Sequence, residues 1–288
     1  MSHPKYAVFT MDVEAFSHTE CVRNAEYDAD ADLMDGFDAY IRILEDSGIK
    51  STLFTVGALA PKIADRLHRC MKNGHRLALH SYDHIAPMEQ TPEVFRAQTR
   101  KAKQALSRQF NTPVVGYRAP CFSMDARRLE ILRELGFHYD SSHLDFLPAS
   151  HTVKLDLSSF RKLRDGIFRK DGFYEFGLAK QRLLCFDLPI SGGGYVRLGK
   201  WDVMKGLIRR HIHTCDYYVF YLHPFELTME AVPKIKGLKF YDRLYLHAGI
   251  KSYAGKIRQI IEMLRRNGFQ FVTFEELTEI LNREISPQ

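Results

Sequence analysis

Apolar segments of five to eight residues alternate along the chain with amphipathic segments of 11 to 18 residues. A short apolar run bounded by turn residues is typical of a buried strand, whereas apolar positions at a helical period indicate a helix. The short apolar segments predict strands at residues 6–11, 51–56, 76–80, 114–119, 137–141, 183–190, 217–223 and 269–274. The amphipathic segments predict helices at residues 32–47, 61–73, 92–109, 125–135, 201–213 and 252–267.

Four of the predicted helices end in a glycine that is followed directly by an apolar strand, at Gly48, Gly74, Gly136 and Gly268. Glycine commonly closes a helix because it adopts the left-handed conformation without a penalty from a Cβ atom. Four helix-to-strand junctions of one kind indicate a parallel sheet built from βα units. About eight strands and about six helices favour an α/β fold, a distorted and incomplete (β/α) barrel, over an open doubly wound sheet.

The chain shows no linker rich in Pro, Gly or Ser, so residues 1–288 predict a single domain. Residues 142–180 are longer and less periodic than the other connections, and they predict a loop insertion packed on that domain. Residues 283–288 are expected to fray.

Composition narrows the class of protein. Hydrophobic residues make up 45% of the chain and charged residues 26%, which is typical of a globular protein. No apolar run is long enough for a transmembrane helix, and residues 1–12 lack the features of a signal peptide. The five cysteines are widely spaced without a C-x-x-C pair, which fits a reducing compartment, so we expect a cytoplasmic protein.

The net charge of +6 is distributed unevenly. Residues 1–50 carry a net charge of −7, and residues 231–270 carry +7. This polarity is compatible with an anionic substrate, with an anionic membrane surface, or with two solvated faces that have no partner. Because no block of five like charges occurs, we do not expect a nucleic-acid partner.

Polar side chains follow four of the predicted strands. They are Asp12, Glu14, His80, His84, Arg118 and His223. In a parallel barrel the carboxyl ends of the strands meet at one rim, where active sites are built. We therefore expect these six side chains to lie close together.

The pair His80 and His84 predicts a metal site. If Ser81 to His84 forms one helical turn, both rings face the same side and can bind one ion. A histidine pair at this spacing can also be an ordinary surface or core pair, but its place directly after a buried strand favours the metal. Two histidines and one carboxylate suit Zn, Fe(II), Co or Mn.

Four segments also carry a resemblance to a known family. They are Asp-Val-Glu at residues 12–14, His-Ser-Tyr-Asp-His at 80–84, Arg-Ala-Pro-Cys-Phe at 118–122, and Leu-His at 222–223. In this order they resemble the motifs of the polysaccharide deacetylase family, also called carbohydrate esterase family 4. The resemblance covers nearly the whole chain and implies a distorted (β/α) barrel that removes an acyl group from an amino sugar with the help of a metal.

The segments at 191–195 and 223–226 further resemble a branch of that family associated with bacterial exopolysaccharide and O-antigen assembly. The family resemblance implies that Glu14, His80 and His84 bind one divalent ion, with Zn expected and Fe, Co or Mn as alternatives. Most members have Asp-Asp in the first motif. Val13 stands in the second place here, so Glu14 is expected to be the ligand.

The resemblance implies further roles at the rim. Asp12 is expected to be the general base, Arg118 to keep it ionised and oriented, and His223 to be the general acid. Each residue has an alternative: Asp12 as a second metal ligand, Arg118 as a structural ion pair, and His223 as a buried histidine without a catalytic role.

The third and last motifs imply an acyl site. The backbone N–H of Cys121 is expected to stabilise the oxyanion, and Phe122 and Leu222 to form a small apolar pocket. Cys121 as a nucleophile is a weaker hypothesis, because nothing nearby predicts an activated thiolate. The fourth motif of the family has no clear match, although Asp187 or residues 175–176 could replace parts of it.

A carbohydrate is the expected substrate, either anionic or linked to a carrier. Arg182, Arg197 and Lys200 flank the glycine run 192–194 and could hold a negative group. The run itself could cradle a phosphate, but a lone glycine run more often predicts a tight turn.

The leading hypothesis is a metal-dependent hydrolase that removes an N-acyl group, expected to be N-acetyl, from a sugar in lipopolysaccharide, O-antigen or other surface polysaccharide biosynthesis. Two alternatives remain open: an amidase or imidase acting on a non-carbohydrate substrate, and a carbohydrate-binding protein that keeps the fold without catalysis.

Overall fold

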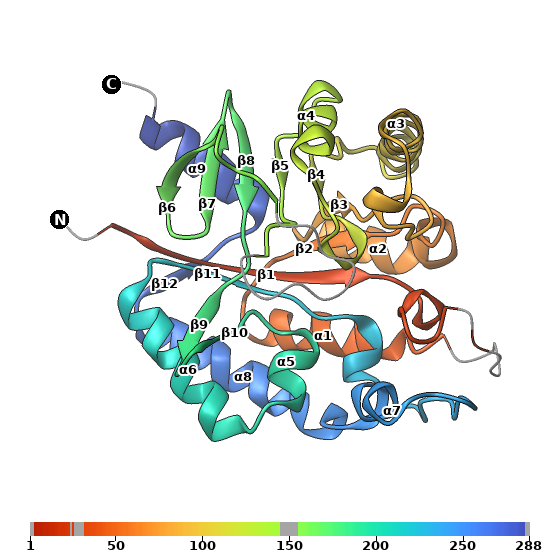
Figure 1. Cartoon of the computed structure of the whole chain (residues 1–288), viewed down its shortest axis with the longest axis vertical. Helices are drawn as coiled ribbons and strands as arrows, with labels where there is room; N and C mark the ends of the chain where they lie inside the picture. Colours follow the sequence, from red (N-terminus) through yellow and green to blue (C-terminus); the bar gives the residue numbers. More distant parts are fainter. Residues whose placement is uncertain (1–2, 24, 26–31, 145–154, 286–288) are drawn as a thin grey trace.

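A ten-stranded sheet curls into an incomplete barrel at the centre of the molecule (Figure 1). The computed structural model describes residues 3–23, 25, 32–144 and 155–285. The strands of the sheet are β1 (Lys5–Val13), β2 (Ser51–Thr55), β3 (Arg76–Leu79), β4 (Gly116–Tyr117), β5 (Tyr139–Asp140), β6 (Arg161–Arg164), β7 (Ile167–Lys170), β8 (Phe173–Phe176), β11 (Tyr217–Phe220) and β12 (Phe269–Phe271).

Most neighbouring strands of this sheet are parallel. Their order is β11-β1-β2-β3-β4-β5-β8-β7-β6, and β12 pairs with the first half of β1. Only β7 runs antiparallel to its neighbours β6 and β8. A separate hairpin is formed by β9 (Lys180–Leu183) and β10 (Phe186–Pro189). The predicted α/β, incomplete (β/α) barrel is therefore confirmed.

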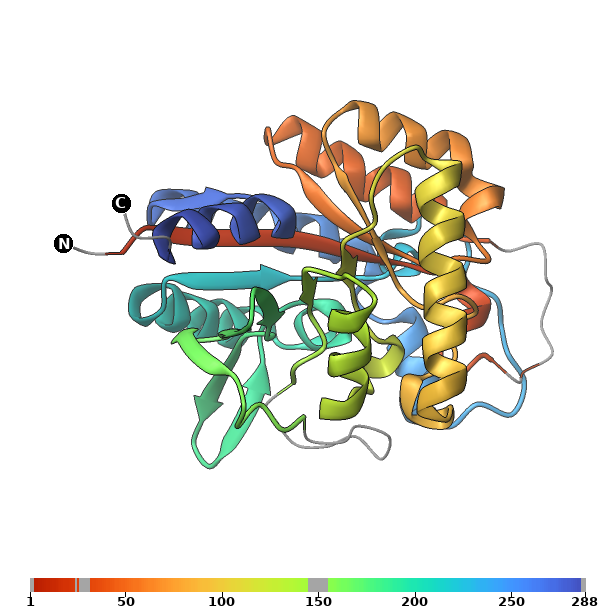
Figure 2. The ribbon, with the colours of Figure 1, turned by 90° about the horizontal axis from the view of Figure 1, so that it is seen from above.

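The helices that surround this sheet are α1 (Asp35–Asp46), α2 (Ala64–Lys72), α3 (Pro92–Gln109), α4 (Ala126–Glu134), α5 (Gly193–Leu198), α6 (Trp201–Thr214), α7 (Phe240–His247), α8 (Ile250–Arg266) and α9 (Phe274–Ile285). Seen from above, they lie on both sides of the long strand β1 (Figure 2). None of the helices in the described ranges is long and apolar enough to cross a membrane.

The barrel is incomplete because its two edge strands do not pair within the described part of the chain. They are joined by side chains instead. Arg164 on β6 contacts the carboxylate of Asp216, just before β11, at 3.4 Å. Gly166 lies against the ring of Tyr217. The sheet therefore curls far enough to enclose an interior without closing its hydrogen-bonded ladder.

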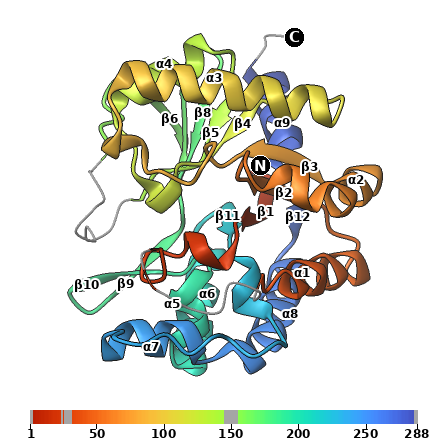
Figure 3. The ribbon, with the colours of Figure 1, turned by 90° about the vertical axis from the view of Figure 1, so that its right-hand side faces the viewer.

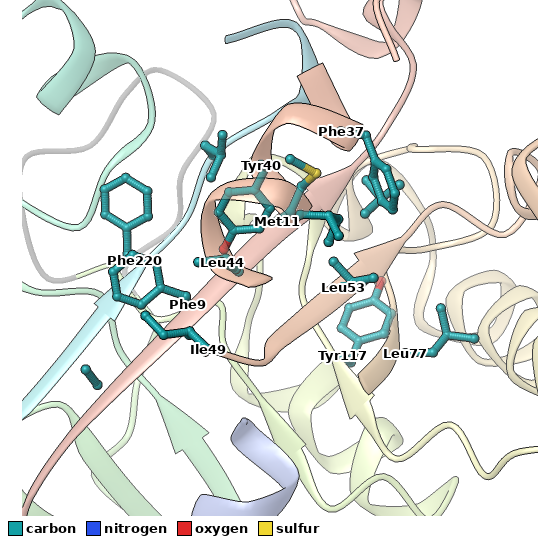
Figure 4. Close-up of a cluster of buried hydrophobic side chains, with 14 of the residues drawn as sticks. Phe9, Met11, Phe37, Tyr40, Leu44, Ile49, Leu53, Leu77, Tyr117 and Phe220 are labelled. Carbon is teal, nitrogen blue, oxygen red and sulfur yellow. The ribbon is translucent and has the colours of Figure 1, made fainter. Parts of the chain in front are cut away.

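Alternation along the strands separates two apolar layers. On β1, Tyr6 and Val8 belong to the cluster inside the barrel. Phe9 and Met11 belong to the larger cluster between the sheet and the helices, where they pack with Tyr40 of α1 (Figure 4). Each face of a buried strand thus has its own apolar partner, which explains why the strands read as nearly continuous apolar runs.

Helix α9 closes the end of the barrel at which β1 begins (Figure 1). Its first residue, Phe274, has its ring centroid 4.7 Å from Phe176, 5.3 Å from Tyr139 and 6.0 Å from Phe54. Burying such aromatic rings stabilises the fold by several kcal/mol in total, at about 25 cal/mol per Å² of apolar surface. The carboxyl ends of the strands lie at the opposite end of the barrel.

Residues 142–180 differ from the expected loop insertion. Residues 161–176 form β6, β7 and β8, which complete the sheet, while 145–154 lie outside the described residues. The two tight connections are Asp165-Gly166 and Asp171-Gly172, and Asp-Gly is the dipeptide that favours two-residue hairpin turns. Gly166, Asp171 and Gly172 all have positive φ. These turn signals, more than apolar periodicity, specify this region.

Other elements also differ from expectation. The predicted strand 183–190 is divided between the two strands of the hairpin β9–β10. Helix α9 begins at Phe274, expected as the end of a strand, and includes residues 283–285 of the tail expected to fray, while 286–288 lie outside the described residues. Helix α7 was not predicted. These segments are short or begin directly after a strand, so their apolar periods are too brief to separate helix from strand.

The glycine run leads from β10 into α5 and does not form the expected tight turn. Gly192 has φ +114°, and a Cβ atom there would lie 2.1 Å from the carbonyl oxygen of Tyr221. The N–H of Gly193 donates to that same carbonyl at 2.8 Å, and α5 begins at Gly193. The glycines allow this backbone to lie directly against the end of β11.

Gly192→Ala should therefore lower the free energy of unfolding by at least about 2 kcal/mol, because the methyl group meets backbone at a strained φ. Gly206→Ala in α6 is the matched control, since nothing lies within 4 Å of the added atom. That change should stabilise the protein by about 0.5–1 kcal/mol. Urea denaturation of the two variants checks the difference, and equal stabilities would contradict the close approach.

Candidate metal centre

The alternation of β1 delivers two carboxylates to the inside of the barrel rim. Thr10, Asp12 and Glu14 continue the inward-facing series that begins at Tyr6, while Val13 faces the outer layer. The backbone N–H of Asp12 donates to Leu222 at 3.0 Å, which ties this end of β1 to the residues after β11. Both carboxylates are buried. Val13, which stands between Asp12 and Glu14, thus points away from the site.

His80 and His84 reach the same rim without the helical turn suggested by their spacing. His80 directly follows β3, and the chain then bends, with positive φ at Ser81 (60°) and His84 (61°). The hydroxyl of Ser81 accepts a hydrogen bond from the N–H of His84 at 2.9 Å. This local bond and the two left-handed residues fold the segment back on itself.

Glu14, His80 and His84 form one compact cluster of metal-type donors. Oε2 of Glu14 lies 2.5 Å from Nε2 of His84 and 3.8 Å from Nε2 of His80. One donor atom from each residue lies within 4.8 Å of the other two, and all three residues are buried. Two imidazole nitrogens and a carboxylate oxygen at such separations fit a single divalent ion with open positions.

The protonation states of these side chains also suit metal binding. Nδ1 of His80 lies 2.8 Å from the carbonyl oxygen of Arg118. Because a carbonyl can only accept, this nitrogen carries the proton and Nε2 keeps its lone pair for a ligand. Burial alone would raise the pKa of Glu14, but the nearby His84 and His223 and the hydrogen bond from His84 hold it well below its usual value. Glu14 is therefore a carboxylate.

Arg118 lies fully buried behind Asp12. Its Nη1 donates to Oδ1 of Asp12 and to Oγ1 of Thr10, both at 2.8 Å. Its Nε and Nη2 donate to the carbonyl oxygen and the hydroxyl of Ser141, at 3.0 and 2.9 Å. The guanidinium also lies 4.1 Å from the ring centroid of Phe54. These contacts orient one oxygen of Asp12 and leave Arg118 out of reach of a substrate.

Glu175, considered above for the fourth motif, is buried on β8 and does not line the cavity at the rim. Its Oε1 accepts hydrogen bonds from the N–H groups of Ser142 and His143 at 3.0 and 2.9 Å. Burial and the neighbouring charge of Asp140 raise the pKa of Glu175 well above its usual value, which favours its protonated form. Asp187 instead pairs with Lys180 on the β9–β10 hairpin.

Glu226 is the carboxylate that binds His223, and sequence reasoning missed it. Its Oε2 lies 3.1 Å from Nδ1 of His223 and accepts the backbone N–H of His223 at 3.0 Å. A glutamate three residues after the start of a helical turn is the capping-box pattern, which was the available signal. Arg197 donates from Nε to Oε1 of Glu226 at 2.9 Å.

This arrangement corrects the expectation that Arg197 holds an anionic substrate, because its side chain is fully buried and paired. Burial alone would lower the pKa of His223. The charges of Glu14, Glu226 and Asp12, with the hydrogen bond to Glu226, raise this pKa to about 9. The imidazole is therefore protonated at neutral pH in this arrangement.

These groups line one cavity of about 220 Å³ at the rim. Its walls are Asp12, Glu14, His18, Thr19, Glu20, His80, His84, Cys121, Phe122, Leu144, Tyr195, Tyr221, His223 and Tyr245. Sequence reasoning missed the aromatic wall formed by Tyr195, Tyr221 and Tyr245. It also missed His18, whose ring stacks on His84 with centroids 5.2 Å apart.

Leu222 was expected in the acyl pocket, but it does not line this cavity. It is fully buried in the layer between the sheet and the helices. Successive residues of an extended chain point to opposite faces, so a chain that turns Tyr221 and His223 inward must turn Leu222 outward. Phe122 and Tyr221 form the apolar contact inside, with ring centroids 5.2 Å apart.

Cys121 and Phe122 both adopt left-handed backbone conformations, with φ of 53° and 54°. Two adjacent non-glycine residues in this region carry strain, and such strain concentrates at ligand sites. Burial, together with nearby Glu20 and Glu14, raises the pKa of the Cys121 thiol to about 12. The thiol is therefore neutral at physiological pH, which argues against a nucleophilic role.

Two family models match the chain. Residues 27–139 match the model described as "Polysaccharide deacetylase", and residues 151–279 match a "Domain of unknown function (DUF3473)". No curated protein sequence matches. The first range contains His80 and the second contains His223, and strands of both ranges lie in the same sheet.

Solved structures share the fold. A protein from Mycobacterium smegmatis classed as a polysaccharide deacetylase aligns over 100% of this chain and 94% of its own, with 16% identity and a TM-score of 0.60. The CE4 domain of a multidomain xylanase from the hindgut metagenome of Trinervitermes trinervoides aligns over 99% and 94%, with 16% identity and a TM-score of 0.52. A CE4 family pseudoenzyme from Bacillus anthracis aligns over 96% and 66%, with 12% identity and a TM-score of 0.53.

Replacing His80 or His84 by Ala should abolish binding of a divalent ion at this cluster. Loss of a partner outside the ligands already weakens metal binding about 10–100-fold, so loss of a ligand should weaken it by at least ~100-fold. Titration calorimetry of the metal-stripped protein with Zn²⁺ measures the change. His213→Ala, at an exposed position of α6, is the matched control. Unchanged affinity in both cluster variants would contradict the site.

Proposed function

This chain belongs to the polysaccharide deacetylase family, and from that membership we propose that it is a metal-dependent hydrolase that removes an N-acyl group, N-acetyl in the first place, from a sugar. The observation that carries the proposal is the content of one cavity. It holds the cluster of Glu14, His80 and His84, the carboxylate of Asp12 and the imidazole of His223. Family membership alone would not distinguish an active hydrolase from a pseudoenzyme such as the one from Bacillus anthracis.

Glu14, His80 and His84 are proposed as the ligands of one divalent ion, zinc as the first choice and Fe, Co or Mn as alternatives. When bound there, the ion supplies Lewis acidity, which polarises an acyl oxygen and lowers the pKa of water. The chain's own contribution is to hold three buried donors in place. The bond from His80 to the carbonyl of Arg118 sets which ring nitrogen faces the cluster.

Asp12 is proposed as the general base. One of its oxygens accepts from Arg118 at 2.8 Å, which keeps the group ionised and oriented. The other oxygen can then take a proton from the water whose oxygen bonds to the acyl carbon.

His223 is proposed as the general acid. Because Nδ1 is bound to Glu226, Nε2 is the nitrogen that can give its proton to the sugar nitrogen as the C–N bond breaks. Arg197 holds Glu226 from the other side, so Arg197 and Glu226 act as positioning residues. We assign Glu226 to the fourth motif of the family, for which the sequence showed no clear match.

The acyl group is proposed to lie against Phe122 and Tyr221, with the backbone N–H of Cys121 directed at the oxyanion. The cavity of about 220 Å³ and its rings suit a small acyl group better than a long one. The carbohydrate itself would extend toward Tyr195 and Tyr245.

We further place this activity in the synthesis of a surface polysaccharide or O-antigen, within the cytoplasm. The supports are the branch resemblance of residues 191–195 and 223–226 and the unpaired cysteines, for which a reducing compartment is suited. The shared sheet supports one catalytic unit spanning both matched ranges.

Acetate release from a panel of N-acetylated sugars, run beside a panel of cyclic imides, tests the activity. Turnover of sugars alone supports the proposal. Turnover of imides alone would move the chain to the amidase class, and no turnover by metal-loaded protein on either panel would make it a binding protein.

Asp12→Asn should retain the metal and lose at least ~100-fold in kcat, since an amide cannot accept the proton. Metal content and kcat are measured on the same preparation. If this variant instead loses the metal, Asp12 is a ligand and the division of roles between Asp12 and Glu14 is incorrect.

Glu226→Gln should lower kcat and move the alkaline limb of its pH profile to lower pH. Glu226 is one of the groups that raise the pKa of His223 to about 9, and a neutral amide removes that contribution. A general acid acts in its protonated form, so activity is present below this pKa and is lost as the pH rises through it.

Glu230→Gln, at an exposed position nearby, is the control for this change. A purely structural role of Glu226 would lower activity by the same factor at every pH. Such a profile would contradict the assignment of His223 and Glu226.

A further inference from the structure

Helix α7 presents an apolar stripe to solvent. Phe240 is 72% exposed and Tyr241 is 79% exposed, and Leu244 is also exposed on the next turn. These positions are three and four apart, so they share one face of the helix. Leu246 is buried on the opposite face and holds α7 to the protein. Side chains this large and apolar are not left side by side in water without a reason.

Basic side chains surround this stripe. Lys234, Lys236, Lys239 and Arg243 are all exposed, and the first three lie in the segment leading into α7. The acidic residues from 230 to 250 are Glu230 and Asp242 only. We call Phe240, Tyr241 and Leu244, with these four cations, the α7 surface.

A second apolar projection lies on the same side of the molecule. At the tip of the β9–β10 hairpin Leu184 is 88% exposed, and Leu183 and Phe186 are exposed beside it. Arg182 lies next to them in sequence. Figure 3 shows the hairpin at the left and α7 at the lower left, beneath the barrel.

We propose that the α7 surface docks this protein on an anionic lipid membrane. An interfacial helix of this kind buries aromatic and leucine side chains at the headgroup level while its cations contact lipid phosphates. Aromatic rings alone could also stack on a glycan, but a neutral glycan gives no role to the four cations, and an anionic glycan gives none to the exposed aliphatic side chain of Leu244. A second copy of this chain would bring the same positive charges together. Charge complementarity therefore selects the membrane.

The docking surface adjoins the cavity described above. Tyr245 lies on α7 itself and lines the cavity with Tyr195, and Arg197 donates to the carbonyl oxygens of Tyr245 and Ala248 at the end of the helix. A membrane bound at α7 would hold the rim near the lipid headgroups, where a lipid-borne sugar would be found. The proposal does not depend on amide hydrolysis, since it concerns binding of the membrane alone.

Vesicle co-sedimentation with the intact protein tests whether the α7 surface binds an anionic membrane. Vesicles of phosphatidylglycerol and phosphatidylcholine should bind the protein, and vesicles of phosphatidylcholine alone should bind it at least ~10-fold more weakly. Binding should weaken as salt rises, because the Debye length falls to about 3 Å at 1 M. Combined Lys236→Glu and Lys239→Glu should weaken binding by at least ~10-fold, about fivefold for each cation.

The apolar part is tested separately by combined Phe240→Ser and Tyr241→Ser, which should also weaken binding by at least ~10-fold. Matched controls are Val94→Ser on α3 and Lys62→Glu with Lys72→Glu near α2, all exposed positions, which should bind like the unchanged protein. Metal content and circular dichroism of each variant show that the barrel is intact.

Three results would overturn the proposal. One is equal binding to anionic and neutral vesicles. Another is a dimer in solution that the Phe240→Ser change dissociates, which would assign the surface to a second copy. The last is binding to a soluble neutral glycan that depends on Phe240 and Tyr241 while vesicle binding is absent.

Discussion

The buried guanidinium of Arg118 organises the rim of the barrel. A charge without solvent contact is tolerated only when it is paired and hydrogen-bonded, and removing a partner from such a pair typically costs 3–5 kcal/mol. Arg118 meets this requirement with Asp12 on β1 and Ser141 after β5, while its own carbonyl holds the ring of His80 after β3. A shift of β1 would leave the charge unpaired, and a shift of β5 would remove two of its hydrogen bonds. One buried residue thus positions both the carboxylate of Asp12 and the ring of His80.

Much of this rim follows from local patterns. Three local patterns predict the (β/α) barrel: apolar runs for the strands, glycines at the ends of helices, and polar groups at the ends of strands. The last of these also predicts that Asp12, His80 and His84 lie close together. Strict alternation along β1 and after β11 would also have predicted that Leu222 points away from the cavity. The error there came from assigning a role by resemblance rather than by the period of two.

The remaining features depend on contacts that no local pattern contains. Strands β6 to β8 are four residues each, and their assignment rests on Asp-Gly turns rather than apolar period. Arg197 meets Glu226 across 29 positions, inside a fully buried pair. An arginine beside a glycine run looks like an anion site in sequence, and only tertiary packing shows that its charge is already neutralised.

The contacts of Arg197 connect His223 with helix α7. Its Nε binds the carboxylate that holds His223, and its Nη1 and Nη2 bind the last carbonyls of α7. Displacing the end of that helix would deprive a buried cation of two acceptors, and the carboxylate would have to compensate. The hydrogen bonding of His223 and the attachment of α7 are therefore coupled through Arg197, and the coupling free energy is the same in both directions. Any partner that binds the end of α7 would therefore change the proton affinity of His223, and the protonation of His223 would change the affinity for that partner.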